Sequence, residues 1–453
     1  MSRIKLNNVD LAWLRMENSS NPMMITVLLQ FKGRVDYDRL LKVIDDVFGR
    51  YRRFRQCVVR PEGFLARPYW EDDPNYCVED HMDRAKLRLP ADDGAVEELV
   101  KTKMNTLLDF ARPLWQITFV DNHPDGTLLV ARVHHCIADG ISLMQVFLQM
   151  TQTAAEAAAE PVAAGMPYSG IAKPNAPRPD AAPKPLPGKT FPHPPLASIL
   201  LASLKIIFRR PDPPSILKGP LGKTKRAVWS QPYSLPEIKA IARHHHATVN
   251  DVLMAMASGA FQRYMDLHHD HPTRNIRAFI MVNLRGHTID YELGNKFGLV
   301  FLKMPIDRAT PLEGLEALKH GMDTLKASAE YAATYFILNI LGQVPKWVED
   351  IAIRILDAKG TVVATNVPGP RREMYLAGAP ISSIKAWVPQ SGRIGVGLSF
   401  ISYNDQVMLG LNVDAGLIPD PESILELFTE EFRAYQALVP EPVGDWVTVS
   451  NPV

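Results

Sequence analysis

A proline-rich segment near the middle of the chain places the strongest constraint on how it can fold. Eleven of the thirty-five residues at positions 161–195 are proline. Proline fixes φ and lacks a backbone donor, so this composition disfavours both helix and sheet. The chain has 453 residues, 46% of them hydrophobic, which exceeds what one core usually serves. We therefore expect two lobes, at residues 1–160 and 216–453, joined by a linker with an amphipathic helix at 161–215.

Strand and helix patterns alternate on both sides of this segment, which predicts an α/β fold. The expected strands cover residues 24–31, 115–120, 127–135, 276–282, 361–366, 394–402 and 407–414. The expected helices cover residues 36–51, 235–244, 249–265 and 421–438, with more from residue 311. The runs at 115–120 and 127–135 flank a turn and form a predicted hairpin.

The sequence HHCIADG at residues 134–140 joins the strand at 127–135 to a following helix. Its four fixed identities should arise by chance on the order of once in a thousand chains of this composition. The helix carries apolar residues along one side and is expected to run on into the alanine-rich residues 154–160. This order of strand, loop and helix places titratable groups at the end of a sheet.

Two adjacent histidines on a strand point to opposite faces, so only one of them can enter a given cavity. His135 is the last residue before the loop and is our candidate general base, because an imidazole titrates near neutral pH. His134 is expected to be a buried supporting residue. Asp139 either contacts the imidazole or pairs with an arginine, and it can also cap the helix. Gly140 leaves room beside the base.

Three cysteines, Cys57, Cys77 and Cys136, are widely spaced and suggest reduced thiols, which is typical of a cytoplasmic protein. We expect Cys136 to be a buried small residue rather than a nucleophile. The histidines at 244–246 and at 268, 269 and 271 suit a metal ion poorly, so no metal is expected. Fifty basic and forty-nine acidic residues give no overall attraction to nucleic acid.

HHxxxDG with a proline-rich linker and a second α/β half resembles the chloramphenicol acetyltransferase-like superfamily. Further motifs are similar to those of the wax ester synthase/diacylglycerol acyltransferase family. They are NNVDLAWLRMENSSNPMM at 7–24, Pro113-Leu114-Trp115, Thr248-Val249-Asn250-Asp251-Val252 and Asn366-Val367-Pro368-Gly369-Pro370. Taken singly, these segments also read as a capping arrangement, a strand followed by a turn, and a strand entry. The resemblance covers nearly the whole chain.

The resemblance implies two lobes, each a mixed sheet flanked by helices, with His135 inside a tunnel between them. It implies transfer of a long-chain acyl group from acyl-CoA to a fatty alcohol or diacylglycerol, by direct attack and without an acyl-enzyme. Acyl-CoA is then a co-substrate, and no cofactor is needed. In the superfamily the motif aspartate pairs with a distant arginine, for which Arg55 is the first candidate and Arg285 the second. Asn250 and Asp251 match an Asn-Asp pair of the family and are expected to support the site or the packing between the lobes rather than to take part in the chemistry.

Residues 196–210 place apolar side chains along one helical face and end in Arg209 and Arg210. Such a helix either packs against the core of the protein or lies on a membrane or lipid-inclusion surface. No signal peptide or membrane-spanning run is recognised. Two alternatives to the acyl-CoA enzyme stay open: a carrier-protein-dependent acyltransferase of the same fold, and a non-catalytic lipid-binding homologue.

Overall fold

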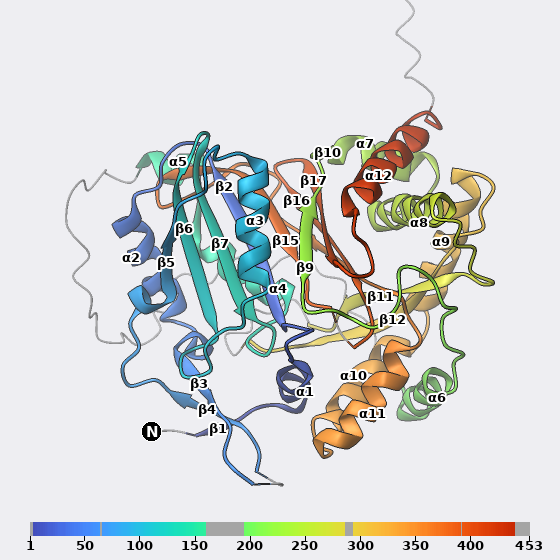
Figure 1. The fold of residues 1–453 in the computed structure, drawn as a ribbon, viewed down its shortest axis with the longest axis horizontal. Helices are drawn as coiled ribbons and strands as arrows, with labels where there is room; N and C mark the ends of the chain where they lie inside the picture. The colour runs from blue at the N-terminus through green and yellow to red at the C-terminus, as the bar shows by residue number, and fades with distance from the viewer. Residues whose placement is uncertain (1–2, 64–65, 160–193, 286–292, 391, 440–453) are drawn as a thin grey trace, which may run out of the picture.

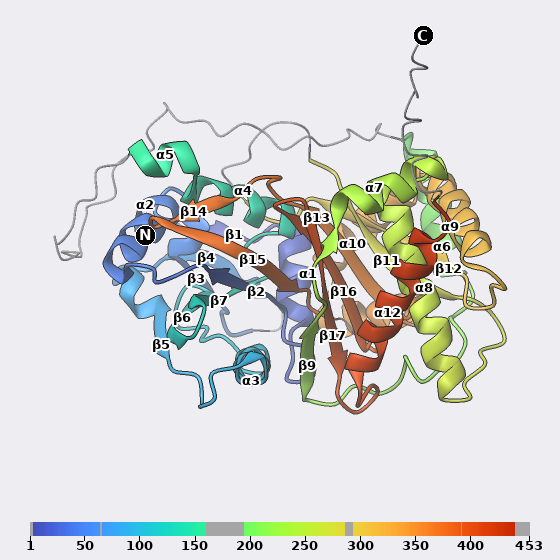
Figure 2. The same ribbon diagram turned by 90° about the horizontal axis from the view of Figure 1, so that it is seen from above.

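The computed structural model describes residues 3–63, 66–159, 194–285, 293–390 and 392–439. Two seven-stranded sheets stand next to each other, and each is covered by helices (Figure 1). Seen from above, the two sheets form separate lobes with α1 (Asn8–Met16) between them (Figure 2). The expected α/β architecture of two mixed-sheet lobes is confirmed.

The first sheet has the strand order β5-β6-β7-β2-β15-β14-β8. Its strands are β2 (Met24–Phe31), β5 (Met82–Ala85), β6 (Trp115–His123), β7 (Gly126–His134), β8 (Thr151–Thr153), β14 (Met374–Leu376) and β15 (Ala379–Trp387). The helices of this lobe are α2 (Tyr37–Phe48), α3 (Asp93–Met104), α4 (Gly140–Met150) and α5 (Ala154–Ala159). Three short strands, β1 (Ile4–Lys5), β3 (Gln56–Val59) and β4 (Tyr69–Asp72), make a separate small sheet.

The second sheet has the order β10-β17-β16-β13-β11-β12, with β9 paired to β17. Its strands are β9 (Lys225–Trp229), β10 (Tyr233–Ser234), β11 (Ile276–Asn283), β12 (Phe297–Met304), β13 (Val362–Pro368), β16 (Val396–Tyr403) and β17 (Gln406–Asp414). A hydrophobic core joins one face of this sheet to α7 (Leu235–His244), α8 (Val249–Leu267), α9 (Pro311–Lys326) and α12 (Pro421–Gln436). The opposite face meets α6 (Leu196–Ile207), α10 (Glu330–Leu341) and α11 (Lys346–Asp357). This two-sided burial follows from the apolar run on both faces of β11.

The second half of the chain contributes two strands to the first sheet. β15 pairs antiparallel with β2, from Ile381 beside Phe31 to Trp387 beside Thr26. The indole of Trp387 is fully buried and donates a hydrogen bond of 3.0 Å to the carbonyl of Val228. Residues 374–387 therefore belong spatially to the first lobe, so the expected unit at 216–453 is not a separate lobe. The expected linker at 161–195 lies almost entirely outside the described residues.

The helix after HHCIADG is shorter than the sequence indicated. α4 ends at Met150, and Thr151–Thr153 form β8, which pairs with β14 before α5 begins. The β-branched Thr151 and Thr153 suit an edge strand, and the unpaired edge of β14 supplies the partner. The helix at 196–207 is confirmed. Within the described ranges, no helix combines the length and the apolar character needed to cross a bilayer.

Candidate active site

His135 is held at the end of β7 by backbone contacts from both neighbouring strands. Its own N–H donates to the carbonyl of Met23 at 2.7 Å, just before β2. The N–H of His134 donates to the carbonyl of Leu114 at 2.9 Å, just before β6. His135 is 1% exposed. The Pro113-Leu114-Trp115 motif thus fixes the strand end that carries the imidazole.

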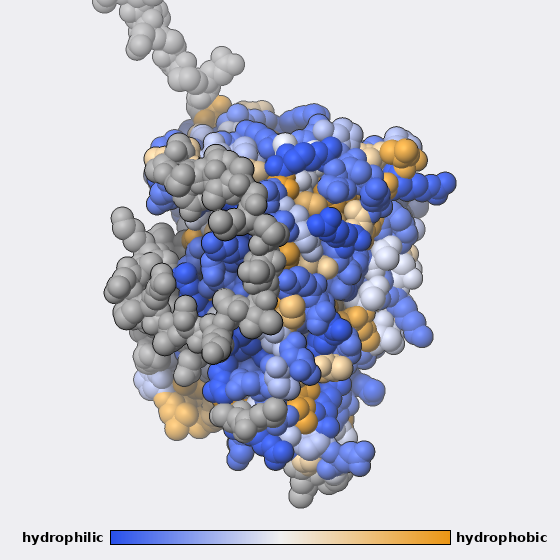
Figure 3. Space-filling model, turned by 90° about the vertical axis from the view of Figure 1, so that its left-hand side faces the viewer, coloured by the Kyte–Doolittle hydropathy of each residue, from blue (hydrophilic) through white to orange (hydrophobic). Residues whose placement is uncertain are grey.

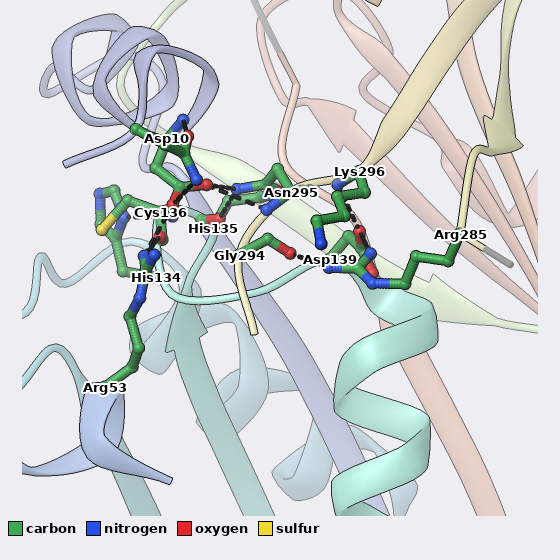
Figure 4. A network of polar contacts seen from close by, with 11 residues as sticks. Asp10, Arg53, His134, His135, Cys136, Asp139, Arg285, Gly294, Asn295 and Lys296 are labelled. Atoms are coloured by element: carbon green, nitrogen blue, oxygen red, sulfur yellow. Dashed lines mark hydrogen bonds and ion pairs between the residues drawn. The ribbon is translucent and has the colours of Figure 1, made fainter. Parts of the chain in front are cut away.

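Asn295 sets the orientation of the His135 imidazole. Its side-chain nitrogen donates to Asp10 Oδ1 at 2.8 Å and to the His135 carbonyl at 2.7 Å. These two acceptors turn Asn295 Oδ1 toward the ring, where it lies 2.9 Å from His135 Nδ1 (Figure 4). Because that oxygen can only accept, Nδ1 carries the proton and Nε2 keeps its lone pair.

Aromatic rings and burial keep this imidazole neutral. The ring of Trp13 stacks on His135 with centroids 4.3 Å apart and planes 10° apart, and Phe297 lies 5.8 Å away. Burial lowers the pKa of His135 to about 4, although the nearby Asp139 carboxylate raises it. A neutral imidazole with a free Nε2 is the form that can accept a proton at neutral pH.

Asp139 forms an ion pair with Arg285, which follows β11 in the second lobe (Figure 4). The same carboxylate caps α4 by accepting from the N–H of Ser142 at 3.0 Å and also accepts from the N–H of Lys296 at 3.1 Å. Arg285 donates in addition to the Gly294 carbonyl. The expected capping role is confirmed, and the second candidate arginine is the partner.

Arg55, the first candidate, is not the partner of Asp139. It ends a short 3-10 turn (Arg52–Arg55) in the first lobe, where its carbonyl accepts from the N–H of Asp73 at 3.0 Å. The resemblance to related sequences suggested this role for Arg55, but Arg285 approaches Asp139 from across the lobe boundary. The neighbouring Arg53 instead pairs with Asp10 at 2.6 Å.

The other residues of the motif are packed into the structure. His134 is fully buried, with Nδ1 accepting from the N–H of Cys136 at 3.0 Å and Nε2 3.2 Å from Glu17 Oε2. Burial raises the pKa of the Cys136 thiol, which disfavours a thiolate nucleophile. A Cβ on Gly140 would lie 3.4 Å from the side chain of Val367, at the limit of ordinary van der Waals contact. All three cysteines are free thiols.

Two outer motifs have structural roles that the structure shows directly. Trp115 is buried, donates from Nε1 to the Phe54 carbonyl at 2.8 Å and stacks on His81 with centroids 4.3 Å apart. Thr248 and Asp251 form a reciprocal capping box at the start of α8. Asp251 therefore caps its own helix, which is the local capping arrangement that the segment alone also allowed.

A first cavity opens beside His135 and is almost entirely apolar. It lies between the first sheet and helices α2 and α4 and has a volume of about 140 Å³. His135 and Gly140 are at one part of its wall, together with Thr365 and Val367 of β13. Aliphatic side chains of β2, β6 and β7 and the ring of Phe48 make up much of the rest. The cavity suits a hydrocarbon chain whose reactive end reaches the imidazole.

A second cavity, of about 490 Å³, lies between the second sheet and the start of α8. It gathers the remaining motif residues Asn250, Asn366, Pro368 and Gly369. Asn366 Nδ2 donates to Asn250 Oδ1 at 3.4 Å across it. Sequence motifs that are 116 positions apart therefore meet at one polar site, away from the imidazole itself.

The sequence did not single out Asp10, Trp13 or Asn295, although all three surround His135. Asp10 and Trp13 lie within the opening motif, but nothing in their local spacing shows that α1 would pack between the lobes. Asn295 follows the undescribed residues 286–292 and has no local pattern that marks it. Among the described residues, no group of three His, Cys, Asp or Glu side chains is placed to hold a metal ion.

Comparison with known proteins places this geometry in context. Residues 6–253 match the wax ester synthase/diacylglycerol acyltransferase catalytic domain, and residues 293–436 match the WS/DGAT C-terminal domain. The O-acyltransferase WSD of Acinetobacter baylyi is 22% identical over 453 residues, covering 96% of this chain and 97% of that protein.

Two solved structures share the fold. The wax ester synthase/diacylglycerol acyltransferase from Marinobacter aquaeolei VT8 matches with a TM-score of 0.69 and 22% identity, over 96% of this chain and 99% of that chain. The first condensation domain of the calcium-dependent antibiotic synthetase matches with a TM-score of 0.65 and 13% identity, over 98% of each chain.

Replacing Arg285 should destabilise the protein through the buried carboxylate that it leaves behind. Arg285→Met should lower the free energy of unfolding by about 3–5 kcal/mol, because Asp139 would lose its charged partner. Arg55→Met is the matched control at another arginine. Denaturant unfolding of the two variants and the wild type measures the loss of unfolding free energy. If Arg285→Met were as stable as Arg55→Met, the ion pair would not hold the lobes together.

Proposed function

We propose that this chain, which belongs to the wax ester synthase/diacylglycerol acyltransferase family, is an enzyme. It moves a long-chain acyl group from acyl-CoA to a fatty alcohol or diacylglycerol. One observation carries the proposal: a neutral imidazole, fixed with Nε2 free, lines an apolar cavity. An alcohol and a thioester need such a base and a place for hydrocarbon, and both are present here.

The proposed reaction is a direct acyl transfer. His135 Nε2 takes the hydroxyl proton of the acceptor as its oxygen attacks the thioester carbonyl carbon. The tetrahedral intermediate collapses by breaking the carbon–sulfur bond, and the imidazolium returns its proton to the CoA thiolate. Acyl-CoA is the co-substrate, and no bound cofactor takes part in these steps.

Asn295 is the positioning residue of this reaction. Its amide cannot rotate without losing both Asp10 and the His135 carbonyl as acceptors. The proton therefore stays on Nδ1, and the lone pair stays on the side of the ring that can meet a substrate. Asp10 is in turn held by Arg53, so the orientation is fixed by three linked side chains.

We further propose that the protein works at a lipid surface, which it meets through α6 and α11. Both helices pack beside α10 at one end of the second lobe (Figure 1). Their outer faces leave large apolar side chains in solvent, including Phe208 at 81%, Leu196 at 63% and Trp347 at 60% exposed. The full surface consists of Leu196, Leu200, Leu201, Leu204, Ile207, Phe208, Ile340, Trp347, Ile351 and Ile355.

The residues of this apolar surface come from α6 and the residue that ends it, from α11 and, in the case of Ile340, from α10. On the face shown in Figure 3, hydrophobic residues lie in small groups among hydrophilic ones. Ile206 turns inward from α6 and is buried. The helix therefore packs on the core with one side, as one sequence interpretation expected, and leaves the predicted apolar side uncovered.

Charge favours an anionic lipid surface as the occupant. Lys205 and Arg210 are exposed on and just after α6, and Arg354 is exposed on α11. Lys346 begins α11 and is exposed too, paired with Asp350 at 2.5 Å. Basic residues around an apolar helix face combine attraction to anionic headgroups with insertion of the apolar side chains.

A third cavity lies between α11 and Trp13, and so between this apolar surface and the candidate active site. It is apolar, has a volume of about 50 Å³ and is lined by Trp13, which stacks on His135. Ile353 and Leu356 of α11 line its other side. A water-insoluble acceptor leaving a lipid surface under α11 would thus meet apolar walls as far as Trp13, which stacks on the imidazole.

The base is tested by thiol release from palmitoyl-CoA, with hexadecanol or dipalmitoylglycerol as acceptor. His135→Ala should lower kcat by roughly a hundredfold or more, since the acceptor hydroxyl would lose its base. His271→Ala, at an exposed histidine, is the control and should behave like the wild type. Acceptor-dependent release that survives in His135→Ala would contradict the proposal, as would loss in a well-folded His134→Ala alone.

The positioning role of Asn295 is tested by separating kcat from KM. Asn295→Ala should lower kcat at least about tenfold while KM for palmitoyl-CoA changes less than twofold, since the imidazole loses its fixed tautomer. Asn105→Ala is the matched control, because Asn105 also bridges the lobes, to the Lys225 carbonyl at 2.9 Å. It should lower stability only. A parallel fall of kcat and stability in both variants would assign Asn295 a structural role.

The lipid surface is tested by flotation with phosphatidylglycerol vesicles. The Leu200→Glu/Leu204→Glu variant and the single variant Ile351→Glu should each stop floating, because a carboxylate would enter the apolar face. Leu267→Glu is the control, at a leucine that is 65% exposed on α8. It should float like the wild type. Unchanged flotation of the α6 and α11 variants would reject this surface.

A further inference from the structure

We propose that the second cavity binds the phosphate groups of the CoA donor through Lys239 and Arg371, and that the pantetheine arm reaches His135 between β11 and β13. The inference rests on the proposed acyl-CoA chemistry and assigns the donor to one side of the second sheet. It also gives a role to motif residues that the reaction at His135 leaves unused.

The passage is a place where two neighbouring strands stop pairing. β11 and β13 are hydrogen-bonded as a parallel pair only from Ala278 beside Val362 to Ile280 beside Ala364. Both strands continue past these pairs, β11 to Asn283 and β13 to Pro368. Their facing edges beyond Ile280 and Ala364 therefore have no ladder between them.

The first and second cavities meet at this point. Thr365 of β13 and Met281 of β11, the residues that follow the last paired positions, line both cavities. Elsewhere along β13 alternate residues line the two cavities. Val367 lines the first cavity, and Asn366 lines the second. Alternate residues of a strand face opposite sides of a sheet, so the cavities lie on opposite faces. Where the ladder ends, the side chains of Thr365 and Met281 form the wall that the two cavities share, and Met281 lines the third cavity as well.

The second cavity has the chemistry that a phosphorylated ligand needs. Lys239 of α7 and Arg371, just after Gly369, both line it. Neither side chain is in an ion pair with a carboxylate of the described residues. Asn250, Asn366 and Ser402 add side-chain hydrogen-bonding groups to the wall. Two unneutralised cations beside amides and a hydroxyl favour a ligand with several anionic oxygens.

The phosphates, the pantetheine arm and the thioester of CoA follow one another in the same order as the second cavity, the passage and the first cavity. Its diphosphate and 3′-phosphate carry the negative charge, the pantetheine arm carries two amides, and the thioester is at the far end. The unpaired edges of β11 and β13 offer backbone donors and acceptors to amides that pass between them. The acyl chain would then continue from the thioester into the apolar first cavity.

The test compares two donors that differ only in the phosphorylated nucleotide, palmitoyl-CoA and S-palmitoyl-pantetheine. Lys239→Met/Arg371→Met should raise KM for palmitoyl-CoA about tenfold or more. KM for S-palmitoyl-pantetheine should change less than twofold. Lys319→Met is the control, at a half-buried lysine of α9 that lines none of the three cavities. Equal shifts with both donors, or none, would overturn the assignment.

Direct binding keeps this inference separable from the proposed reaction. If the wild type released no thiol from either donor, the proposed function would fail, and calorimetric titration with free CoA would still test the site. The double variant should then lose affinity for CoA at least tenfold. The single variant Lys239→Arg, which keeps the charge and leaves Arg371 unchanged, should bind CoA like the wild type. Equal CoA affinity in the wild type and the double variant would overturn the site itself.

The passage has its own probe, adenosine 3′,5′-bisphosphate, which has the 3′-phosphate and one 5′-phosphate of CoA but no pantetheine arm. Met281→Trp should fill the place where the cavities meet and weaken CoA binding at least tenfold. It should leave the affinity for adenosine 3′,5′-bisphosphate within twofold, whereas Lys239→Met/Arg371→Met should reduce it. Undiminished CoA binding by Met281→Trp would place the arm elsewhere.

Discussion

The ion pair between Asp139 and Arg285 joins the two lobes at the point where the imidazole sits. Both side chains are almost fully buried, and the residues are 146 positions apart in the chain. Two charges taken out of water destabilise a fold unless they meet each other and further hydrogen-bond partners. Here the carboxylate also caps α4 and accepts from Lys296, while the guanidinium donates to Gly294. An arrangement of the lobes that separated Asp139 from Arg285 would leave two buried charges without their partner.

The same closure produces the chemical state of His135. Asn295 reaches the imidazole from the second lobe, and α1 brings Asp10 and Trp13 between the lobes. The desolvation that lowers the pKa of His135 to about 4 comes from this packing and keeps the ring unprotonated. Burial thus keeps the imidazole in the neutral form that can accept a proton, although the lowered pKa also makes it a weaker base.

Apolar and polar surfaces are divided around this one residue. The first and third cavities are apolar and adjoin His135 or its stacking partner Trp13, while the second cavity carries Lys239 and Arg371. Exposed apolar residues gather on α6 and α11, next to the third cavity rather than the second. An amphiphilic donor and a water-insoluble acceptor would therefore approach the imidazole from different sides.

Features that depend on near neighbours in the chain could be predicted from the sequence. Strand-like apolar runs located β2 and β7, apolar spacing located α2 and α8, and HHxxxDG marked His135 and the cap formed by Asp139. The tertiary structure alone decided that Arg285 rather than Arg55 pairs with Asp139 and that β15 crosses into the first sheet. Only the folded structure shows that α4 ends before Thr151, where β8 begins, and that Asn295 orients the imidazole. The physical reason is that local periodicity fixes which face of an element is buried, whereas the partner of a buried charge or an open strand edge is set by which distant segments meet when the lobes close.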